Sequence, residues 1–143
     1  MQYQAPLHKK RKRVACHLSE NLLIKYDKRC IPVVKGDTVR VMRGAHKGHE
    51  DKISRVITKD SRVEIEGVTI TKADGTQIAK GLHPSNLLIT KLNLTDNWRR
   101  QNLEKGLSET TKKEIEKEAN EQLKEVTEQE KEAEVAIEAT TEE

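Results

Sequence analysis

A basic loop around a pair of glycines holds the side chains best suited to binding an anion. Arg43, His46 and Lys47 lie within a few residues of Gly44 and Gly48. Cationic side chains attract phosphate oxygens, and a glycine has no side chain to keep a phosphate away from backbone N–H groups. The chemistry that this segment predicts is therefore non-covalent binding of a polyanion.

Two strands flank this loop in the sequence and would fix its position. The Lys-Gly-Asp sequence at 35–37 predicts a tight turn, and residues 38–42 alternate so that the valines face a core while Arg40 faces solvent. Residues 52–57 predict the next strand. Two strands joined by a glycine-hinged basic loop would hold cations at one place on the surface.

A second basic segment lies near the N-terminus. Lys9, Lys10, Arg11, Lys12 and Arg13 are consecutive cations, and they repel one another. We expect an arm that becomes ordered when it lies between RNA phosphates. The alternative is a solvated basic tail or an import-like signal.

A short helix is predicted after the arm, within residues 18–30. Ser19 can cap its N-terminus, and Leu18 and Leu23 have the spacing of a hydrophobic staple. Pro32 would then direct the chain out of the helix and into the first strand.

Further strands are predicted at 31–34, 62–66 and 87–92. The Asp74-Gly75 pair predicts a turn that closes a hairpin with residues 69–72. Several short strands with no helix between them favour a small barrel over a parallel sheet.

The pattern KGD-x-V-x-V-x-x-G-x-x-KG at 35–48 resembles the KOW motif of SH3-like barrels in ribosomal proteins and transcription elongation factors. More of the chain is similar to one family, the universal KOW-containing large-subunit ribosomal protein L twenty-four in its archaeal and eukaryotic form. The similar blocks follow the family's order and lie at 5–12, 17–22, 31–44, 66–76 and 83–94.

The resemblance implies a mainly β fold, a small SH3-like (KOW) barrel, and a structural role in the large ribosomal subunit. It also implies binding of large-subunit rRNA near its five-prime region, an early role in subunit assembly, and a position near the polypeptide exit tunnel. The expected partners are large-subunit rRNA and neighbouring ribosomal proteins, with the chain a monomer within the cytoplasmic ribosome.

The other hypothesis is a KOW module of an elongation factor that contacts RNA polymerase or nascent RNA. Such factors normally carry a mixed α/β domain before the KOW motif, whereas about 30 residues precede it here.

One departure from the KOW pattern is Asp51, where another glycine is usual. Asp tolerates positive backbone dihedrals better than most residues, so we expect the turn to survive. The carboxylates of Glu50 and Asp51 beside the basic loop disfavour direct phosphate contact at that point.

Aromatic side chains are scarce, which limits how RNA could be recognised. Phe is absent, and Tyr3, Tyr26 and Trp98 lie outside the predicted strands. Since stacking on single-stranded bases usually needs aromatic platforms, we expect recognition through phosphates, riboses and helix shape. The residues expected to contact RNA are Lys9, Lys10, Arg11, Lys12, Arg13, Lys35, Arg40, Arg43, Gly44, His46, Lys47, Gly48, Lys52 and Arg55.

Other classes of function find little support in the sequence. Cys16, His17 and Cys30, or His46 with His49, lack the paired spacing of structural zinc ligands, so no metal or cofactor is expected. No nucleophile, Walker or metalloprotease motif is present, which argues against an enzyme. The sequence shows no membrane span or secretory signal, and we expect both thiols to stay reduced.

Charge is divided unevenly along the chain. Residues 1–106 hold 22 Lys and Arg against 11 Asp and Glu, a net charge of +11, while residues 107–143 hold 5 against 13, a net charge of −8. The basic part therefore predicts a polyanionic partner, and the acidic part cannot be its RNA-binding surface.

The expected organisation is a basic N-terminal arm at 1–17, a short helix at 18–30, the barrel at 31–94, an extension at 95–106 and an acidic tail at 107–143. Trp98 would anchor the extension on the domain or pack against RNA or a neighbouring protein. The tail is expected to be helical up to about Val126 and disordered beyond, since like-charged pairs oppose a helix. It would serve as a solubilising tail, as a surface for a basic protein partner, or to suppress non-specific RNA contacts.

Overall fold

The computed structural model describes residues 4–107 and 109–141, and it places side chains as far as 128 except at 110 and 125. The chain forms two compact units, which divide between Asn93 and Leu94. We call the first the sheet unit and the second the helical unit, and each is described by itself.

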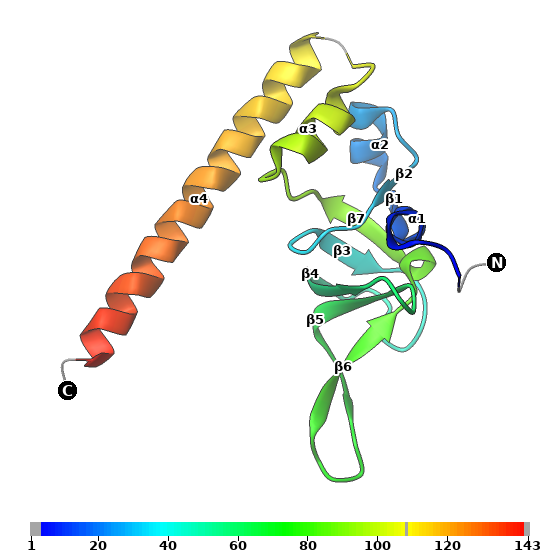
Figure 1. The fold of residues 1–143 in the computed structure, drawn as a ribbon, viewed down its shortest axis with the longest axis vertical. Coiled ribbons are helices and arrows are strands. Elements are labelled where there is room, and N and C mark those ends of the chain that lie inside the picture. The colour runs from blue at the N-terminus through cyan, green and yellow to red at the C-terminus, as the bar shows by residue number, and fades with distance from the viewer. Residues whose placement is uncertain (1–3, 108, 142–143) are drawn as a thin grey trace. The chain divides into compact units, whose positions relative to one another are not determined.

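The described part of the sheet unit contains a sheet of seven strands in the order β2-β1-β7-β3-β4-β5-β6. Neighbouring strands are antiparallel except β1 and β7, which run parallel. The bounds of the strands labelled in Figure 1 are β1 Ala15–Leu18, β2 Cys30–Pro32, β3 Thr38–Val41, β4 Glu50–Ile57, β5 Arg62–Thr71, β6 Gln77–Leu82 and β7 Leu87–Lys91.

The mainly β fold predicted from the sequence is confirmed, and the sheet is compatible with an SH3-like architecture. Its hydrogen-bonded order is open, with β2 at one end and β6 at the other, so it is not a fully closed barrel. The core is aliphatic because alternate residues of the strands point inward; it includes Val39, Val63 and Ile89, each 0% exposed.

Strand β1 was not predicted, because residues 15–17 were assigned to the basic arm. It pairs with β2 on one side and with β7 on the other, and it buries Cys16 and Leu18. A strand of four residues has too short an alternation to stand out in the sequence. Its partners are distant in the chain, and they determine its conformation.

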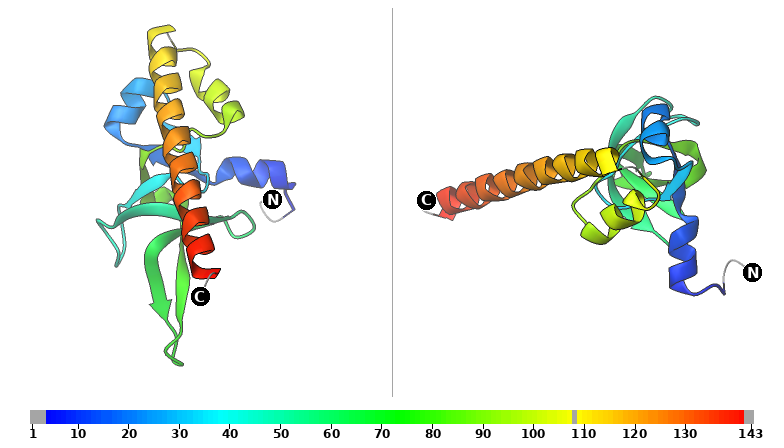
Figure 2. Two further views of the ribbon diagram at one scale, coloured as in Figure 1. Left: turned by 90° about the vertical axis from the view of Figure 1, so that its left-hand side faces the viewer. Right: turned by 90° about the horizontal axis from the view of Figure 1, so that it is seen from above.

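The described part of the sheet unit has two short α-helices, α1 at Leu7–Arg13 and α2 at Glu20–Tyr26, and a 3-10 turn, η1, at Pro84–Asn86. Helix α1 coincides with the basic cluster, buries none of its residues and projects from the side of the sheet (Figure 2). Helix α2 begins after Ser19, as predicted, but the Ser19 side chain makes no capping hydrogen bond. Asp27 ends the helix in the left-handed conformation, with φ of 49°.

The two strands predicted at 62–66 and 69–72 belong to one long strand, β5, with an irregularity in its pairing between Glu64 and Thr69. Gly67 lies inside this irregularity with φ of +74°. The predicted Asp-Gly turn is confirmed: the Lys72 N–H donates to the Thr76 carbonyl over 2.9 Å, and β6 returns along β5. The tip of this hairpin extends beyond the rest of the sheet (Figures 1 and 2).

The helical unit contains α3 at Asn97–Glu104 and α4 at Glu109–Thr141, which contact each other. The Asp96 side chain caps α3 by accepting the Trp98 N–H over 3.0 Å. Helix α4 continues past Val126, where the sequence predicted disorder to begin. Opposite charges at helical spacing, such as Glu121 and Lys124, offset the like-charged pairs on which that prediction rested.

Candidate nucleic-acid interface

The turn before β3 is fixed by a buried carboxylate. Asp37 is 0% exposed, and its side chain accepts the Val34 N–H over 3.0 Å and the Asn93 N–H over 2.8 Å. Its backbone carbonyl accepts the Ile53 N–H over 2.9 Å. Asp37 therefore joins the turn to β4 and to the segment that follows β7.

Gly36 is required at this turn for two reasons. Its φ is +88°, which disfavours any side chain, and an added Cβ would lie only 2.7 Å from the Asn93 side-chain nitrogen. That nitrogen donates to the Lys35 carbonyl over 3.1 Å. The sequence predicted the turn but not the hydrogen bonds that Asp37 and Asn93 make to hold it. The feature of the sequence that could have indicated them is the Gly-Asp pair directly before an alternating strand.

The basic loop connects β3 to β4. The Val41 N–H donates to the His49 carbonyl over 2.9 Å, and the Gly48 N–H donates to the Val41 carbonyl over 2.8 Å, so the base of the loop is held closed. Gly44 and Gly48 have φ of +101° and +90°, and an added Cβ at either would meet no atom within 4 Å. The backbone conformation requires these glycines, and the space above both is open to a ligand.

The cations of this loop differ in exposure. Arg43 and Lys47 are exposed, whereas His46 is partly buried. Because the short loop is closed by backbone hydrogen bonds, it presents both cations close to the open glycines. That Arg43 and Lys47 bind phosphate stays a prediction.

Arg40 points outward from β3, as expected, but its charge is balanced by a neighbour. Glu50 lies opposite Arg40 in the β3–β4 pairing, and its carboxylate accepts hydrogen bonds from Arg40 Nε and Nη2 over 2.9 and 2.8 Å. The Thr90 hydroxyl donates to the other oxygen of the same carboxylate. The hydrogen bond from Thr90 and then those from Arg40 lower the pKa of Glu50 below its usual value.

Asp51, which replaces the usual KOW glycine, lies within β4 opposite Val39. Among the described residues other than glycine, only Asp27 and Ser61 have a positive φ, so the loop forms without a positive φ at Asp51. The positive φ values of the loop are supplied earlier, by Gly44 and Gly48. Asp51 Oδ1 accepts the Lys52 N–H over 2.8 Å, and Oδ2 lies 3.9 Å from His49 Nε2.

The His49 ring covers the irregularity in β5. Its Nε2 lies 3.0 Å from the Glu66 carbonyl oxygen, and an added Cβ at Gly67 would lie 3.0 Å from His49 Cε1. A side chain at residue 67 would crowd the ring, and the positive φ of Gly67 disfavours one as well. No pattern in the sequence indicated this contact.

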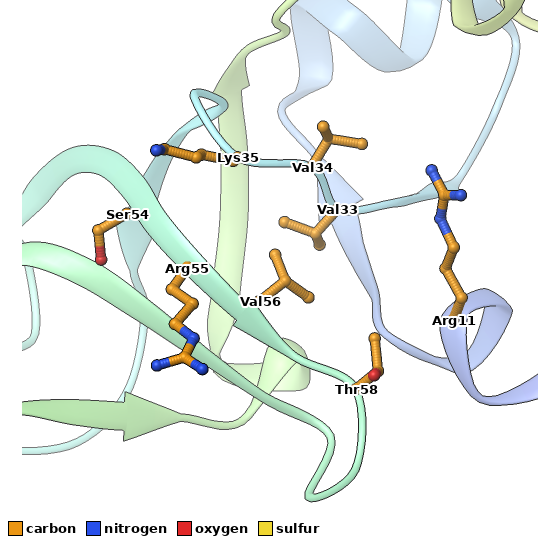
Figure 3. Close-up of a pocket in the computed structure, with 8 residues that line it drawn as sticks. All are labelled: Arg11, Val33, Val34, Lys35, Ser54, Arg55, Val56 and Thr58. Atoms are coloured by element: carbon orange, nitrogen blue, oxygen red, sulfur yellow. The ribbon is translucent and has the colours of Figure 1, made fainter. Parts of the chain in front are cut away.

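The remaining cations gather elsewhere on the sheet unit. Lys52 and Arg55 are exposed on β4, and every basic residue of α1 is exposed except Lys10, which is partly buried. Arg11, Lys35 and Arg55 line one groove with a volume of about 460 Å³ (Figure 3). The structure thus brings together cations from three segments that the sequence does not relate. The lining of this groove does not include Arg43 or Lys47.

The two thiols are free and differ in environment. Cys16 is buried, and burial, followed by the negative charge of Asp37, raises the pKa of its thiol to about 12. Cys30 is exposed.

Within residues 4–107 and 109–141, no three His, Cys, Asp or Glu side chains come together in a way that could hold a metal ion. In the same described ranges, none of the helices has the length and apolarity needed to cross a membrane.

The sequence up to the start of the acidic part is similar to known ribosomal proteins. The family model for ribosomal proteins L26 of eukaryotes and L24 of archaea matches residues 1–106. The large ribosomal subunit protein uL24 of Methanospirillum hungatei is 46% identical over 101 residues, which cover 71% of this chain and 84% of that protein.

Two further archaeal proteins of the same name show similar agreement. The uL24 protein of Saccharolobus solfataricus is 46% identical over 104 residues, covering 73% of this chain and 87% of its own length. The uL24 protein of Methanosarcina barkeri is 44% identical over 103 residues, which cover 72% of this chain and 89% of that protein. The match of the family model ends before the acidic α4 begins.

Proposed function

This chain belongs to the family of ribosomal proteins that comprises L26 of eukaryotes and L24 of archaea, and from that premise we propose that it binds large-subunit rRNA early in subunit assembly and lies near the polypeptide exit tunnel. Members of this family are structural proteins of the large ribosomal subunit and not enzymes. The proposed setting is the cytoplasmic ribosome, with the chain a monomer among rRNA and neighbouring ribosomal proteins.

The observation that carries rRNA binding is the loop between β3 and β4. It presents Arg43 and Lys47 beside two glycines whose surroundings are open, and backbone hydrogen bonds hold its base closed. A preformed loop loses little conformational entropy on binding, so more of the attraction to phosphate remains as affinity. Closely packed RNA helices repel one another, and cations placed between them would lower that repulsion.

The α1 cluster supports a second area of contact. Its cations Lys9, Lys10, Arg11, Lys12 and Arg13 follow one another on a helix with no buried residues, so they surround the helix instead of forming one face. A helix charged on all sides suits a channel lined by phosphates on several sides, whereas a flat duplex surface would engage only part of it. Residues 1–106 carry a net charge of +11, which favours a polyanion as the partner.

Crosslinking in cells tests this proposal directly. The tagged protein is crosslinked to RNA by ultraviolet light, and the attached RNA is sequenced. We expect crosslinks in one part of the large-subunit rRNA, through peptides of the β3–β4 loop and α1. Crosslinks spread over nascent transcripts, with RNA polymerase co-purifying, would contradict the proposal and favour the elongation-factor alternative.

A further inference from the structure

The groove shown in Figure 3 lies between α1, the segment that joins β2 to β3, and β4 with the residue after it. Its lining consists of Arg11, Val33, Val34, Lys35, Ser54, Arg55, Val56 and Thr58. The volume of about 460 Å³ falls within the range of roughly 300–1,000 Å³ that is typical of small-molecule clefts. The groove is therefore large enough for one small organic group.

The floor of the groove is apolar. Val33 is only 5% exposed, and Val56 is partly buried on β4. The two side chains point toward each other across the groove, with Thr58 beside them (Figure 3). A bare phosphate would gain nothing from this floor, because a charged group loses hydration when it lies against apolar side chains. The floor suits a flat, weakly polar group.

The rim of the groove is cationic. Arg11, Lys35 and Arg55 contribute three positive charges from three different segments, and the lining contains no carboxylate. The groove thus has an apolar floor and a cationic rim. This combination suits a ligand that is apolar at its centre and anionic at its ends. A nucleotide within an RNA strand has this character, since the base lies between two phosphates.

We propose that this groove holds the base of one unpaired RNA nucleotide against Val33 and Val56, while Arg11, Lys35 and Arg55 bind its flanking phosphates. The proposal rests on rRNA binding as the function of the chain and adds a site for a single base to it. Extruded bases are held between apolar as well as aromatic side chains, and guanidinium planes also stack on them. Aliphatic contacts would thus replace the aromatic platforms that this sequence lacks, and recognition would not be limited to phosphates and helix shape.

Methyl NMR of the full chain provides the test. Valine methyl groups are labelled, and the protein is titrated with hexauridylate, with a linear polyphosphate of equal charge, and with a blunt RNA duplex. We expect the Val33 and Val56 signals to shift with hexauridylate and to shift much less with the other two, whose phosphates can reach the cationic rim but which offer no unpaired base. Equal shifts with polyphosphate would mean that the rim binds anions without a base and would overturn the proposal. Absence of any shift with hexauridylate would also overturn it.

Two variants test the groove by substitution: one fills it, and the other, a control, leaves it open. Thr58→Tyr places a ring into the groove, whereas Thr71→Tyr places the same ring on an exposed position of β5 outside its lining. Stacking of one base on an aromatic side chain contributes about 5- to 100-fold in affinity, and the aliphatic contacts of this groove correspond to the lower end of that range. We therefore expect Thr58→Tyr to bind hexauridylate about 5-fold more weakly and Thr71→Tyr to bind as the wild type does. Unchanged affinity of Thr58→Tyr would contradict the proposal. The free-protein methyl spectrum establishes that each variant folds.

Binding of large-subunit rRNA by the same proteins separates this inference from the proposed function. If Thr58→Tyr and wild type bind rRNA equally while hexauridylate does not shift the valine methyls, only the single-base site is refuted. If the wild type fails to bind rRNA at all, the proposed function itself fails.

Discussion

A single buried side chain, Asp37, connects three separate parts of the sheet unit. Its carboxylate accepts the backbone N–H groups of Val34 and Asn93, while its own backbone carbonyl accepts the Ile53 N–H. A charged acceptor makes stronger hydrogen bonds than a neutral one, and a partly buried N–H that loses its acceptor is only partly rehydrated. The KOW turn therefore depends on its acidic residue as much as on its glycine.

We predict that Asp37→Asn lowers the free energy of unfolding by about 2–4 kcal/mol, because one carboxylate oxygen is replaced by an NH₂ group that faces an N–H donor. Urea unfolding followed by circular dichroism measures the change. Asp60→Asn, at an exposed turn residue, is the matched control and should have little effect. A loss below about 0.5 kcal/mol for Asp37→Asn would show that the two hydrogen bonds contribute little.

We also predict that only one thiol of the native protein reacts with a disulfide reagent at neutral pH. Cys30 is exposed, whereas burial raises the pKa of Cys16 to about 12 and keeps its thiol protonated. A colorimetric thiol assay should count one reactive group in the native protein and two in urea. Rapid reaction of both thiols in the native protein would show that β1 opens readily.

The same raised pKa predicts how stability depends on pH. Above the ordinary thiol pKa of 9.0, the unfolded chain releases the Cys16 proton while the folded chain keeps it until about pH 12. The unfolded state then binds fewer protons, so the free energy of unfolding should fall as the pH rises from 9 toward 12. Urea midpoints of the wild type and of Cys16→Ala over this range give the measurement, and an equally steep fall in both proteins would assign the effect to other groups.

At the scale of elements, the β3–β4 loop and helix α1 present cations by different means. The loop is fixed by backbone hydrogen bonds and by glycines with positive φ. Helix α1 has no buried residue, and its basic side chains repel one another. Since an isolated helix of seven residues is marginal in water, α1 depends on its surroundings for order, whereas the loop does not. The loop is therefore the better element for a test by charge reversal.

We predict that the double variant Arg43→Glu with Lys47→Glu weakens rRNA binding and flattens its dependence on salt. Each lost phosphate contact removes roughly 0.7–0.9 from the slope of log affinity against log salt concentration, so two contacts remove about 1.4–1.8. Filter binding at potassium chloride concentrations between about 50 and 200 mM measures the slope of log affinity against log salt concentration.

The control for this experiment is Arg62→Glu with Lys72→Glu, which makes the same change in net charge at exposed residues of the β5–β6 hairpin. If both double variants lose the same slope, the effect comes from overall charge and the loop has no special role. An unchanged slope for the loop variant would remove Arg43 and Lys47 from the interface.

At the scale of the whole molecule, the chain separates positive from negative charge along its length. The part that matches the family model has a net charge of +11, and residues 107–143 have a net charge of −8. Helix α4 buries Ile115 and Ala119 but exposes most of its other described residues, many of them acidic. We expect this helix to repel a polyanion and therefore to make no favourable contribution to RNA binding.

We predict that a chain ending at Lys105 binds large-subunit rRNA at least as tightly as the full chain, because removal of the acidic part leaves the net positive charge of the rest unchanged. Filter binding of both proteins at low salt provides the comparison, and urea unfolding establishes that the shorter chain is folded. Failure of a folded shorter chain to bind would show that the acidic part takes part in RNA binding.

Several features were determined by the sequence by itself, because they depend on local pattern. Alternating valines predicted β3, the glycine pair predicted the basic loop, and Asp74-Gly75 predicted the hairpin turn. The order of the similar blocks was sufficient to predict the family, which the match over residues 1–106 confirms. Each of these signals lies within a few residues, where backbone sterics and side-chain alternation act directly.

Other features were decided only by the tertiary structure, because they join residues that are distant in the chain. Strand β1 exists through its pairing with β2 and β7, and Arg40 is neutralised by Glu50 across two strands. Asp37 meets Asn93, and Arg11 lines the same groove as Arg55. Local propensity contains no information on which distant groups meet, since that depends on the burial and strand pairing of the whole sheet.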